Sequence, residues 1–251
     1  MKWVVDVGNS AIRWMPVDRS DPAGKVYWQH DTIITALDQA WGAVTTIPTD
    51  VICSCVAGDD FRQAMTQWCQ QNWQIEPLYI RSPANGCGVE NAYHIADHLG
   101  ADRWAAIVAA HELYQQPVCI VDCGTAITID VIEANGSHQG GLIFPGLNVM
   151  KTALLDHTDI ELEESESGNS RLFARNTADA LGGGGLYTVI AALDRIVADV
   201  AVEMKRNLIN VITGGDAESL IPLLSGDYDH HPDLVLDGLV KISESCLEAC
   251  T

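Results

Sequence analysis

Two stretches, VVDVGNSAIRW at 4–14 and IVDCGTAITID at 120–130, follow one pattern. Each has two apolar residues, an Asp, any residue, a Gly and a small polar residue before strand-like character resumes. A single Asp-x-Gly corner is explained by an ordinary hairpin turn in which the Asp bonds its own turn. The second copy, nearly half the chain away, predicts two like halves that each begin with a strand–turn–strand unit.

Strand and helix signals alternate around these corners, which predicts an α/β fold. We divide the chain into halves at 1–115 and 116–251. The turn-rich stretch SPANGCG at 82–88 is a candidate active-site loop, and ELEESESG at 161–168 is predicted to be an exposed acidic loop. The predicted strands are 2–7, 11–17, 26–30, 51–57, 75–80, 118–124, 126–132, 140–146 and 210–215, and the predicted helices are 32–43, 60–72, 102–114, 148–155 and a long one after the glycines at 182–185.

The chain is strongly acidic, with 14 Lys and Arg against 34 Asp and Glu and a net charge of −20 over 251 residues. This charge argues strongly against a nucleic acid or an anionic membrane as the main partner. Residues 1–30 lack the pattern of a signal peptide, and no apolar run approaches the roughly 20 residues that span a bilayer. We therefore expect a cytoplasmic protein that holds any anionic substrate with local N–H groups, a few Arg or a bound cation.

The eight cysteines form no C-x-x-C pair that would start a zinc site. An even count is compatible with disulfides, but without an export signal we expect the reducing cytosol. Cys53, Cys55, Cys119 and Cys123 lie inside or beside apolar strand-like runs, so we expect them to be buried thiols.

The two corners carry groups that suit phosphate. Glycine allows a close backbone approach, and successive N–H groups of a turn can form an anion-binding concavity. Asn9, Ser10 and Thr125 add short polar side chains. Asp6 and Asp122 would repel a phosphate directly, so we expect a cation between carboxylate and phosphate. An ordinary turn explains either corner alone, whereas the matched pair favours a site for a nucleoside triphosphate.

The stretch LGADRWAA at 99–106 places an acid where a helix is predicted to begin. One interpretation makes Asp102 an N-cap or first-turn acid. The other makes it a general base that takes the proton of a substrate hydroxyl during phosphoryl transfer. Arg103 beside it would hold an anionic group of the substrate, or else form a surface ion pair.

Together these motifs resemble the type III pantothenate kinases of the actin-like phosphotransferase superfamily. DVGNS at 6–10 is similar to the first phosphate motif of that family, and DCGTAITID at 122–130 to the second. NAY and LGADRWAA, between 91 and 106, resemble the substrate and base motif. GGLIFPGLNVMKTAL at 140–154 and NTADALGGG at 176–184 follow in the family's order.

The resemblance implies two duplicated actin-like (ribonuclease H-like) halves, each a mixed β-sheet flanked by helices. It also implies roles for individual residues. Asp102 would accept the proton, Asp122 would coordinate a monovalent cation (potassium or ammonium), and Thr125 would help to bind ATP. The residues lining the ATP phosphates would be Asp6, Val7, Gly8, Asn9, Ser10, Ala11, Ile12 and Arg13, and those contacting pantothenate would be Tyr93, Gly100, Ala101, Asp102, Arg103 and Thr177.

The implied reaction is phosphorylation of pantothenate by ATP, the first step towards coenzyme A, in a homodimer that needs magnesium with ATP. Two departures from the family pattern are visible: Ser10 replaces a frequent Thr, and Ala96 stands where members often carry a proline. A non-catalytic regulatory protein on the same fold is one alternative, and an ATPase or phosphatase for another substrate is a second. The presence of both corners and of Asp102 favours the kinase.

Overall fold

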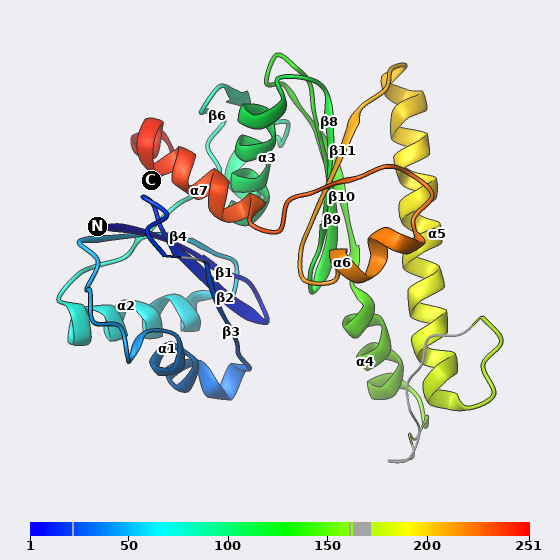
Figure 1. Cartoon of the computed structure of the whole chain (residues 1–251), viewed down its shortest axis with the longest axis horizontal. Coiled ribbons are helices and arrows are strands. Elements are labelled where there is room, and N and C mark those ends of the chain that lie inside the picture. The colour runs from blue at the N-terminus through cyan, green and yellow to red at the C-terminus, as the bar shows by residue number, and fades with distance from the viewer. Residues whose placement is uncertain (22, 161, 163–171) are drawn as a thin grey trace. The chain divides into compact units, whose positions relative to one another are not determined.

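The computed structural model describes residues 1–21, 23–160, 162 and 172–251 (Figure 1). The chain forms two compact units. The predicted acidic loop at 161–168 lies almost entirely outside the described residues. The predicted boundary between residues 115 and 116 stays a prediction. Unit 1 comprises Met1–Val118, Asp130–Gly140 and Asp233–Thr251, and unit 2 comprises Cys119–Ile129 and Gly141–Pro232.

Unit 1 contains a five-stranded mixed sheet. In spatial order its strands are β3 (Gly24–Tyr27), β2 (Ala11–Pro16), β1 (Lys2–Val7), β4 (Asp50–Cys55) and β5 (Leu78–Tyr79). β1 pairs antiparallel with β2 and parallel with β4, which places Asp6 opposite Arg13 on one side and Ser54 on the other. The strand predicted at 75–80 is reduced to two residues, because Pro77 before it cannot donate to a ladder.

The two faces of this sheet follow the period of two along its strands. Trp3, Val5 and Val7 of β1 point into a core that α1 (Ile33–Trp41) and α2 (Asp59–Trp73) cover. Tryptophans dominate this core and meet mostly edge to face or tilted, the arrangements that aromatic rings prefer. The alternate residues Val4 and Ile52, paired across β1 and β4, are fully buried on the other face.

That other face is covered by α7 (Leu234–Ser245), which contacts β1, β2 and β4 and packs against α3 (Ala101–Tyr114). The two helices cross closely because Gly238 has no side chain: a Cβ there would overlap the Ala105 carbonyl oxygen. α3 is buried nearly all round from Ala101 to Ala110, so it is an interior helix.

A second five-stranded sheet has the same order as the first. Its strands are β10 (His138–Pro145), β9 (Ala126–Ile132), β8 (Val118–Cys123), β11 (Ile209–Thr213) and β12 (Asp229–His230). In each sheet the first strand in chain order (β1 or β8) is central. The second and third strands lie in order on one side of it, and the fourth and fifth lie in order on the other side. The repeated sequence corner lies between the first two strands each time, which is the duplication that the sequence predicted.

Unit 2 contributes α4 (Leu147–His157), which contacts α5 (Thr177–Met204), and the short α6 (Ala217–Leu220). The sequence predicted that the long helix would follow the glycine run. This is wrong, because the helix begins at Thr177 and includes the glycines at 182–185. Asn176 caps it by accepting a hydrogen bond from Asp179 N at 2.7 Å, and this cap fixes the start despite the weak helix propensity of glycine.

The turn-rich stretch at 82–88 folds into a small hairpin of β6 (Asn85–Gly86) and β7 (Val89–Glu90) in unit 1. Cys87 at its tip forms a disulfide with Cys246, which lies between α7 and α8 (Leu247–Cys250). The sequence left disulfides open without naming a pair, and only the tertiary fold brings these two cysteines together. The four cysteines predicted to be buried thiols, Cys53, Cys55, Cys119 and Cys123, are confirmed.

In the part of the chain that the structure describes, no helix combines the length and the apolar character that a membrane crossing requires.

Candidate functional site

Asp102 is the second residue of α3, and Gly100 is the N-cap of that helix. The Asp102 carboxylate turns back over the first turn, where its Oδ1 accepts the backbone N–H of Arg103 at 2.7 Å. It thereby satisfies one of the N–H groups that every helix start leaves without an intrahelical partner. Gly100 makes room for this, since a Cβ there would lie 2.5 Å from Asp102 Oδ1. Asp102 is thus a first-turn acid and not the cap.

The surroundings of Asp102 make its carboxyl a stronger base than an exposed aspartate. Burial raises its pKa above the ordinary 3.8, and the Asp130 carboxylate adds a smaller rise. The N–H of Arg103 and the guanidinium charge oppose this shift without cancelling it. A carboxylate with a raised pKa accepts a proton more readily than an ordinary one, so the first-turn position and the role of a base are compatible.

Arg103, the next residue, is buried in an ion pair with Asp130 of β9. Its Nε and Nη2 donate to the two carboxylate oxygens of Asp130 at 2.8 and 2.7 Å, and its Nη1 donates to Tyr93 Oη at 2.8 Å. Burial alone would lower the pKa of the guanidinium, but the hydrogen bonds and charge of Asp130 outweigh it, and the pKa is raised. The alternative of a surface ion pair is therefore wrong, because only 6% of Arg103 is exposed.

His138 of β10 completes this buried network. Its Nδ1 accepts the backbone N–H of Ala92 at 3.4 Å, and its Nε2 lies 3.0 Å from Asp130 Oδ1. A ring that accepts at Nδ1 carries its proton on Nε2, so the neutral imidazole donates to Asp130. The Tyr93 ring stacks over the His138 ring at a centroid distance of 6.3 Å. Tyr93 of the NAY motif is thus bound to Arg103 directly through its hydroxyl. Ala92 is linked to Arg103 indirectly, because its backbone N–H binds His138, which contacts the Asp130 partner of Arg103.

The donors of Arg103 limit what it can do for a substrate. A guanidinium has five N–H groups, of which three are directed at Asp130 and Tyr93. Two remain for any further partner. Sequence reasoning found Arg103 and Tyr93 but missed Asp130 and His138. The available signal was an acid inside the apolar strand 126–132, because a buried carboxylate normally has a cationic partner.

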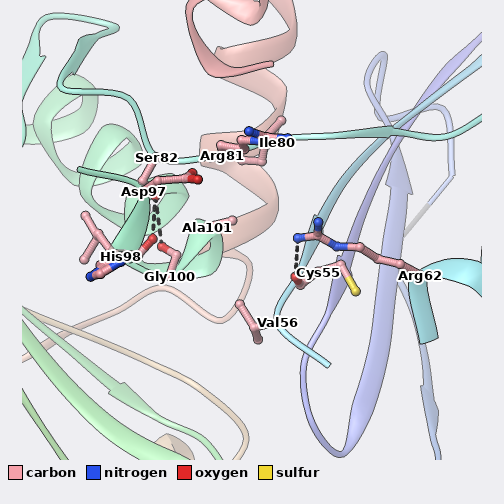
Figure 2. A pocket seen from close by; sticks show the side chains of 11 residues that line it. Cys55, Val56, Arg62, Ile80, Arg81, Ser82, Asp97, His98, Gly100 and Ala101 are labelled. Carbon is pink, nitrogen blue, oxygen red and sulfur yellow. Dashed lines mark hydrogen bonds between the residues drawn. The ribbon is translucent and has the colours of Figure 1, made fainter. Parts of the chain in front are cut away.

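A cavity of about 390 Å³ in unit 1 lies beside the start of α3 (Figure 2). Gly100 and Ala101, two of the predicted substrate contacts, line it, whereas Tyr93, Asp102 and Arg103 are not among its lining residues. Cys55 and Val56 place the cavity at the carboxyl end of β4, the end where open α/β sheets usually bind ligands.

Two arginines of this cavity, Arg62 and Arg81, were not predicted. Figure 2 shows Arg62 extending from α2 towards Cys55, whose carbonyl oxygen accepts from Arg62 Nη2 at 3.2 Å. Gly100 and Ala101 lie on the opposite side. In a chain of charge −20, two arginines against one acid, Asp97, give the cavity lining a local excess of positive charge that suits an anion. No motif marks either residue, so their proximity is a product of tertiary structure.

The predicted ATP motif at 6–13 is the corner between β1 and β2 in unit 1. Its turn is held by Trp28, whose indole Nε1 donates to Gly8 O at 3.0 Å and whose backbone N donates to Ser10 O at 3.0 Å. Gly8 N donates to Ala11 O at 3.0 Å and closes the turn. Asn9 is exposed. The turn is therefore a fixed corner with a solvent-facing tip.

Three residues of this motif have side chains committed elsewhere. Val7 and Ile12 are paired across the strands and fully buried in the tryptophan core, so only their backbone can reach a ligand. The Arg13 guanidinium forms an ion pair with Asp233. Phosphate contacts by Val7 and Ile12 would therefore have to come from their backbone, and the phosphate contacts of the whole motif stay predictions.

The second corner, in unit 2, joins β8 to β9 and contains Asp122, Gly124 and Thr125. Two glycines approach it closely. A Cβ on Gly214 would lie 2.5 Å from Asp122 Oδ1, and a Cβ on Gly146 would lie 2.7 Å from the Thr125 carbonyl oxygen. Gly146 N donates to that oxygen at 3.0 Å. A carboxylate and a backbone carbonyl are both oxygen donors of the type that hard cations prefer.

Thr177 is the first residue of α5 and is exposed, next to the Asn176 cap. Like Asp122 and Thr125 it belongs to unit 2, whereas Asp6, Tyr93 and Asp102 belong to unit 1. The structure thus brings the predicted substrate residues of unit 1 together around the start of α3.

Comparison with known proteins decides the family. A family model described as type III pantothenate kinase matches residues 3–199. The chain belongs to the type III pantothenate kinase family. The type III pantothenate kinase of Nitrosococcus oceani is 43% identical over 248 residues, which cover 96% of this chain and 93% of that protein. The enzyme of Nitrosospira multiformis is 34% identical over 98% of this chain and 92% of its own length.

Solved structures confirm the actin-like fold of this chain. The ethanolamine utilization protein EutJ from Carboxydothermus hydrogenoformans matches with a TM-score of 0.56 and 16% identity, over 96% of this chain and 89% of that chain. A pCBH ParM mutant matches with a TM-score of 0.54 and 9% identity, over 97% and 98% of the two chains. At such identities the likeness concerns the fold alone.

Proposed function

We propose that this chain transfers the γ-phosphoryl group of ATP to the primary hydroxyl of pantothenate, with Asp102 as the general base. Membership of the family makes the chain a phosphotransferase that acts on pantothenate in coenzyme A biosynthesis. The observation that carries the mechanism is the half-buried Asp102 at the start of α3, whose pKa is raised by burial and whose neighbours Gly100 and Ala101 line a cavity.

In this proposal Asp102 accepts the hydroxyl proton as the oxygen attacks phosphorus, and the protein otherwise positions charges. Arg103 stays fixed by Asp130, so its guanidinium presents its two remaining N–H groups in a set direction. Tyr93 is held by Arg103 and by stacking on His138. Such preorganised groups assist the transition state because they need not reorient during the reaction.

The acceptor would occupy the cavity beside Gly100 and Ala101. Pantothenate carries a carboxylate, and Arg62 and Arg81 are the cationic side chains that line this cavity. Arg81 is exposed, whereas Arg62 is anchored to the Cys55 carbonyl. We assign the substrate carboxylate to this pair, and we assign to Thr177 the further substrate contact that the family resemblance implies.

ATP phosphates would be held by N–H groups and short side chains of the turn at 8–10, with Thr125 as a further contact. The donor set at the second corner fits a monovalent cation, with Asp122 as its charged ligand. Such a cation, together with magnesium on ATP, would neutralise phosphate charge in an acidic protein. Asp122→Asn should raise the potassium concentration for half-maximal rate about tenfold, whereas Asp6→Asn should leave it nearly unchanged.

The homodimer, the cytoplasmic location, and the absence of nucleic-acid and membrane partners stay predictions. The decisive assay incubates the protein with ATP, magnesium, potassium and pantothenate and measures phosphopantothenate. Omitting the acceptor, then each cation, identifies what the reaction needs. Phosphopantothenate that depends on pantothenate supports the kinase. Free phosphate without a phosphorylated acceptor would instead identify an ATPase or phosphatase, and no turnover by folded protein would identify a regulatory protein.

A further inference from the structure

Three cysteine side chains meet in unit 1, away from Asp102. Cys87 is at the tip of the β6–β7 hairpin, Cys246 joins α7 to α8, and Cys250 ends α8. Their sulfur atoms all lie within 4.8 Å of one another. Cys87 and Cys246 are bonded, with Cα atoms 5.6 Å apart, a separation that an ordinary disulfide adopts.

The hairpin that carries Cys87 is continuous with the substrate motif. The Asn91 side chain donates to Pro83 O at 3.2 Å and to Ala96 O at 3.1 Å, and Asn91 N donates to Ala84 O at 2.9 Å. These bonds close the segment 83–96 into one loop. Tyr93 lies inside it and is bound to Arg103. A restraint on the hairpin tip is therefore also a restraint on Tyr93.

The hairpin is attached on two sides, in two different ways. On one side Glu90 N donates to Gly136 O at 2.8 Å, and Gly136 approaches the Gly88 carbonyl so closely that a Cβ would overlap it. On the other side α8 packs on the hairpin, and the Cys87–Cys246 bond adds a covalent link. The first side consists of backbone contacts that persist in any redox state. The covalent link on the second can be opened by a thiol.

The helix α8, which follows Cys246, is also connected to the cavity. Arg81 N donates to Cys250 O at 2.6 Å, and Arg81 and Ser82 both line the cavity. A Cβ on Gly86 would lie 3.8 Å from the Ala249 side chain, so α8 packs directly on the hairpin. Opening the disulfide would thus loosen the contact between α8 and the loop next to the proposed acceptor site.

Six of the eight cysteines remain buried thiols, which is the cysteine usage of a reducing compartment. A disulfide in such a compartment is usually transient or redox-sensing. Cys87 and Cys246 are half-buried, so a small thiol can reach them, whereas Cys250 is buried and its pKa is raised by that burial. Cys250 therefore stays protonated and does not take part in the disulfide, which joins Cys87 to Cys246.

We propose that Cys87, Cys246 and Cys250 form a redox-active thiol site whose reactants are low-molecular-weight thiols and disulfides, and that its Cys87–Cys246 bond locks the substrate loop. The thiolate of one cysteine attacks a small disulfide, forms a mixed disulfide and releases one small thiolate. The second cysteine thiolate attacks the protein sulfur of that mixed disulfide and releases the other. Two protein thiols are oxidised, and one small disulfide is reduced to two thiols.

The test uses the full chain equilibrated in glutathione buffers that run from fully reduced to fully oxidised. Thiol titration after denaturation should find eight thiols at the reduced end and six at the oxidised end, in one reversible transition. Peptide mapping should identify Cys87–Cys246 as the bond. Cys87→Ser and Cys246→Ser should each abolish the transition, whereas Cys250→Ser and the remote control Cys69→Ser should preserve it. Cys87→Ala serves if one serine variant fails to fold.

The lock on the loop rests on the proposed kinase function and has its own readout. Reduction should raise KM for pantothenate about threefold or more with KM for ATP unchanged, and Cys87→Ser should behave as reduced enzyme in every buffer. Equal KM values in both states would overturn the lock. A thiol transition in a protein without kinase activity would overturn the proposed function and leave the thiol site standing.

Two results would overturn the thiol site itself. One is a bond that native protein never forms or never releases across the glutathione series. The other is stoichiometric zinc in protein purified under reductant, with the three thiols protected from alkylation until a chelator is added. That outcome would make the cluster a metal site, since three thiolates are also ligands for a soft cation.

Discussion

The corner at Asp6 and the corner at Asp122 share a sequence pattern and a place in their sheets, yet they are fixed by different means. The first is held by a side chain, the indole of Trp28, over a core of tryptophans. The second is enclosed by backbone, with Gly146 and Gly214 packed against it. A duplicated motif therefore preserves chain geometry while its support diverges. The two corners should fail under different substitutions.

If the two corners hold phosphate and Asp102 takes the proton, the largest loss of kcat should come from a substitution outside both corners, at Asp102. Asp102→Asn should lower kcat by about 10²–10⁴-fold with nucleotide affinity retained. Its melting temperature should be unchanged or about 2 °C higher. A carboxyl whose folded pKa is raised loses stability as pH rises through that pKa, and the amide avoids this loss. Asp97→Asn, an exposed acid of the same cavity, is the control, and full activity of Asp102→Asn would remove the base assignment.

The second corner should be sensitive to added volume. Gly214→Ala should lower kcat/KM for ATP about 100-fold, because a Cβ 2.5 Å from both Asp122 Oδ1 and the Cys123 backbone must displace the corner that carries the carboxylate. Gly140→Ala is a matched control. Gly140 has a φ of +98° against +95° for Gly214, and a Cβ there meets nothing within 4 Å. Equal losses in the two variants would show that backbone strain, and not crowding of Asp122, limits the enzyme.

The first corner should be sensitive to a lost hydrogen bond. Trp28→Phe removes the donor to Gly8 O while keeping a ring beside Phe61, so KM for ATP should rise a few-fold and stability should fall by about 1 kcal/mol. Trp3→Phe is the control, because within the described residues Trp3 Nε1 has no hydrogen-bond partner. If both variants shift KM for ATP equally, the Trp28 bond is not what holds the corner.

The smallest effect near neutral pH concerns the acid limb of the rate profile. Asp102 must be ionised to accept a proton, and burial raises its pKa above 3.8. The fall in kcat/KM for pantothenate on acidification should therefore begin at a higher pH than an ordinary aspartate would give. The residual activity of Asp102→Asn should lack this limb. A limb that persists in the variant would assign it to another group.

Local pattern was enough to predict most elements of the fold. The strand predicted at 126–132 coincides with β9, and the helix predicted at 102–114 differs from α3 by one residue, because alternation and capping signals are local. The helix start at Thr177 was missed. The low helix propensity of the four glycines led to a predicted start after them, and the Asn176 cap was not recognised. In the structure the capped helix runs through the glycines.

The residues of the candidate site also differ in whether a local sequence pattern marks them. Asp102, Arg103 and Tyr93 were found because each lies in a short motif. Asp130, which fixes Arg103, and His138 were missed, since each reaches the site from a different strand. The same holds for Arg62 and Arg81 at the cavity. Side chains that meet across distant segments leave no spacing signature in the sequence.

The sequence by itself determined the duplication, the two Asp-x-Gly corners and the acid at the start of α3, because hydrophobic period, turn chemistry and motif order are written along the chain. Only the tertiary structure decided which of those residues have side chains available. It placed Val7 and Ile12 in the core, bound Arg13 to Asp233 and brought Cys87 to Cys246 across 159 residues. Those outcomes depend on packing between segments that are far apart in sequence, and packing is settled only when the whole core closes.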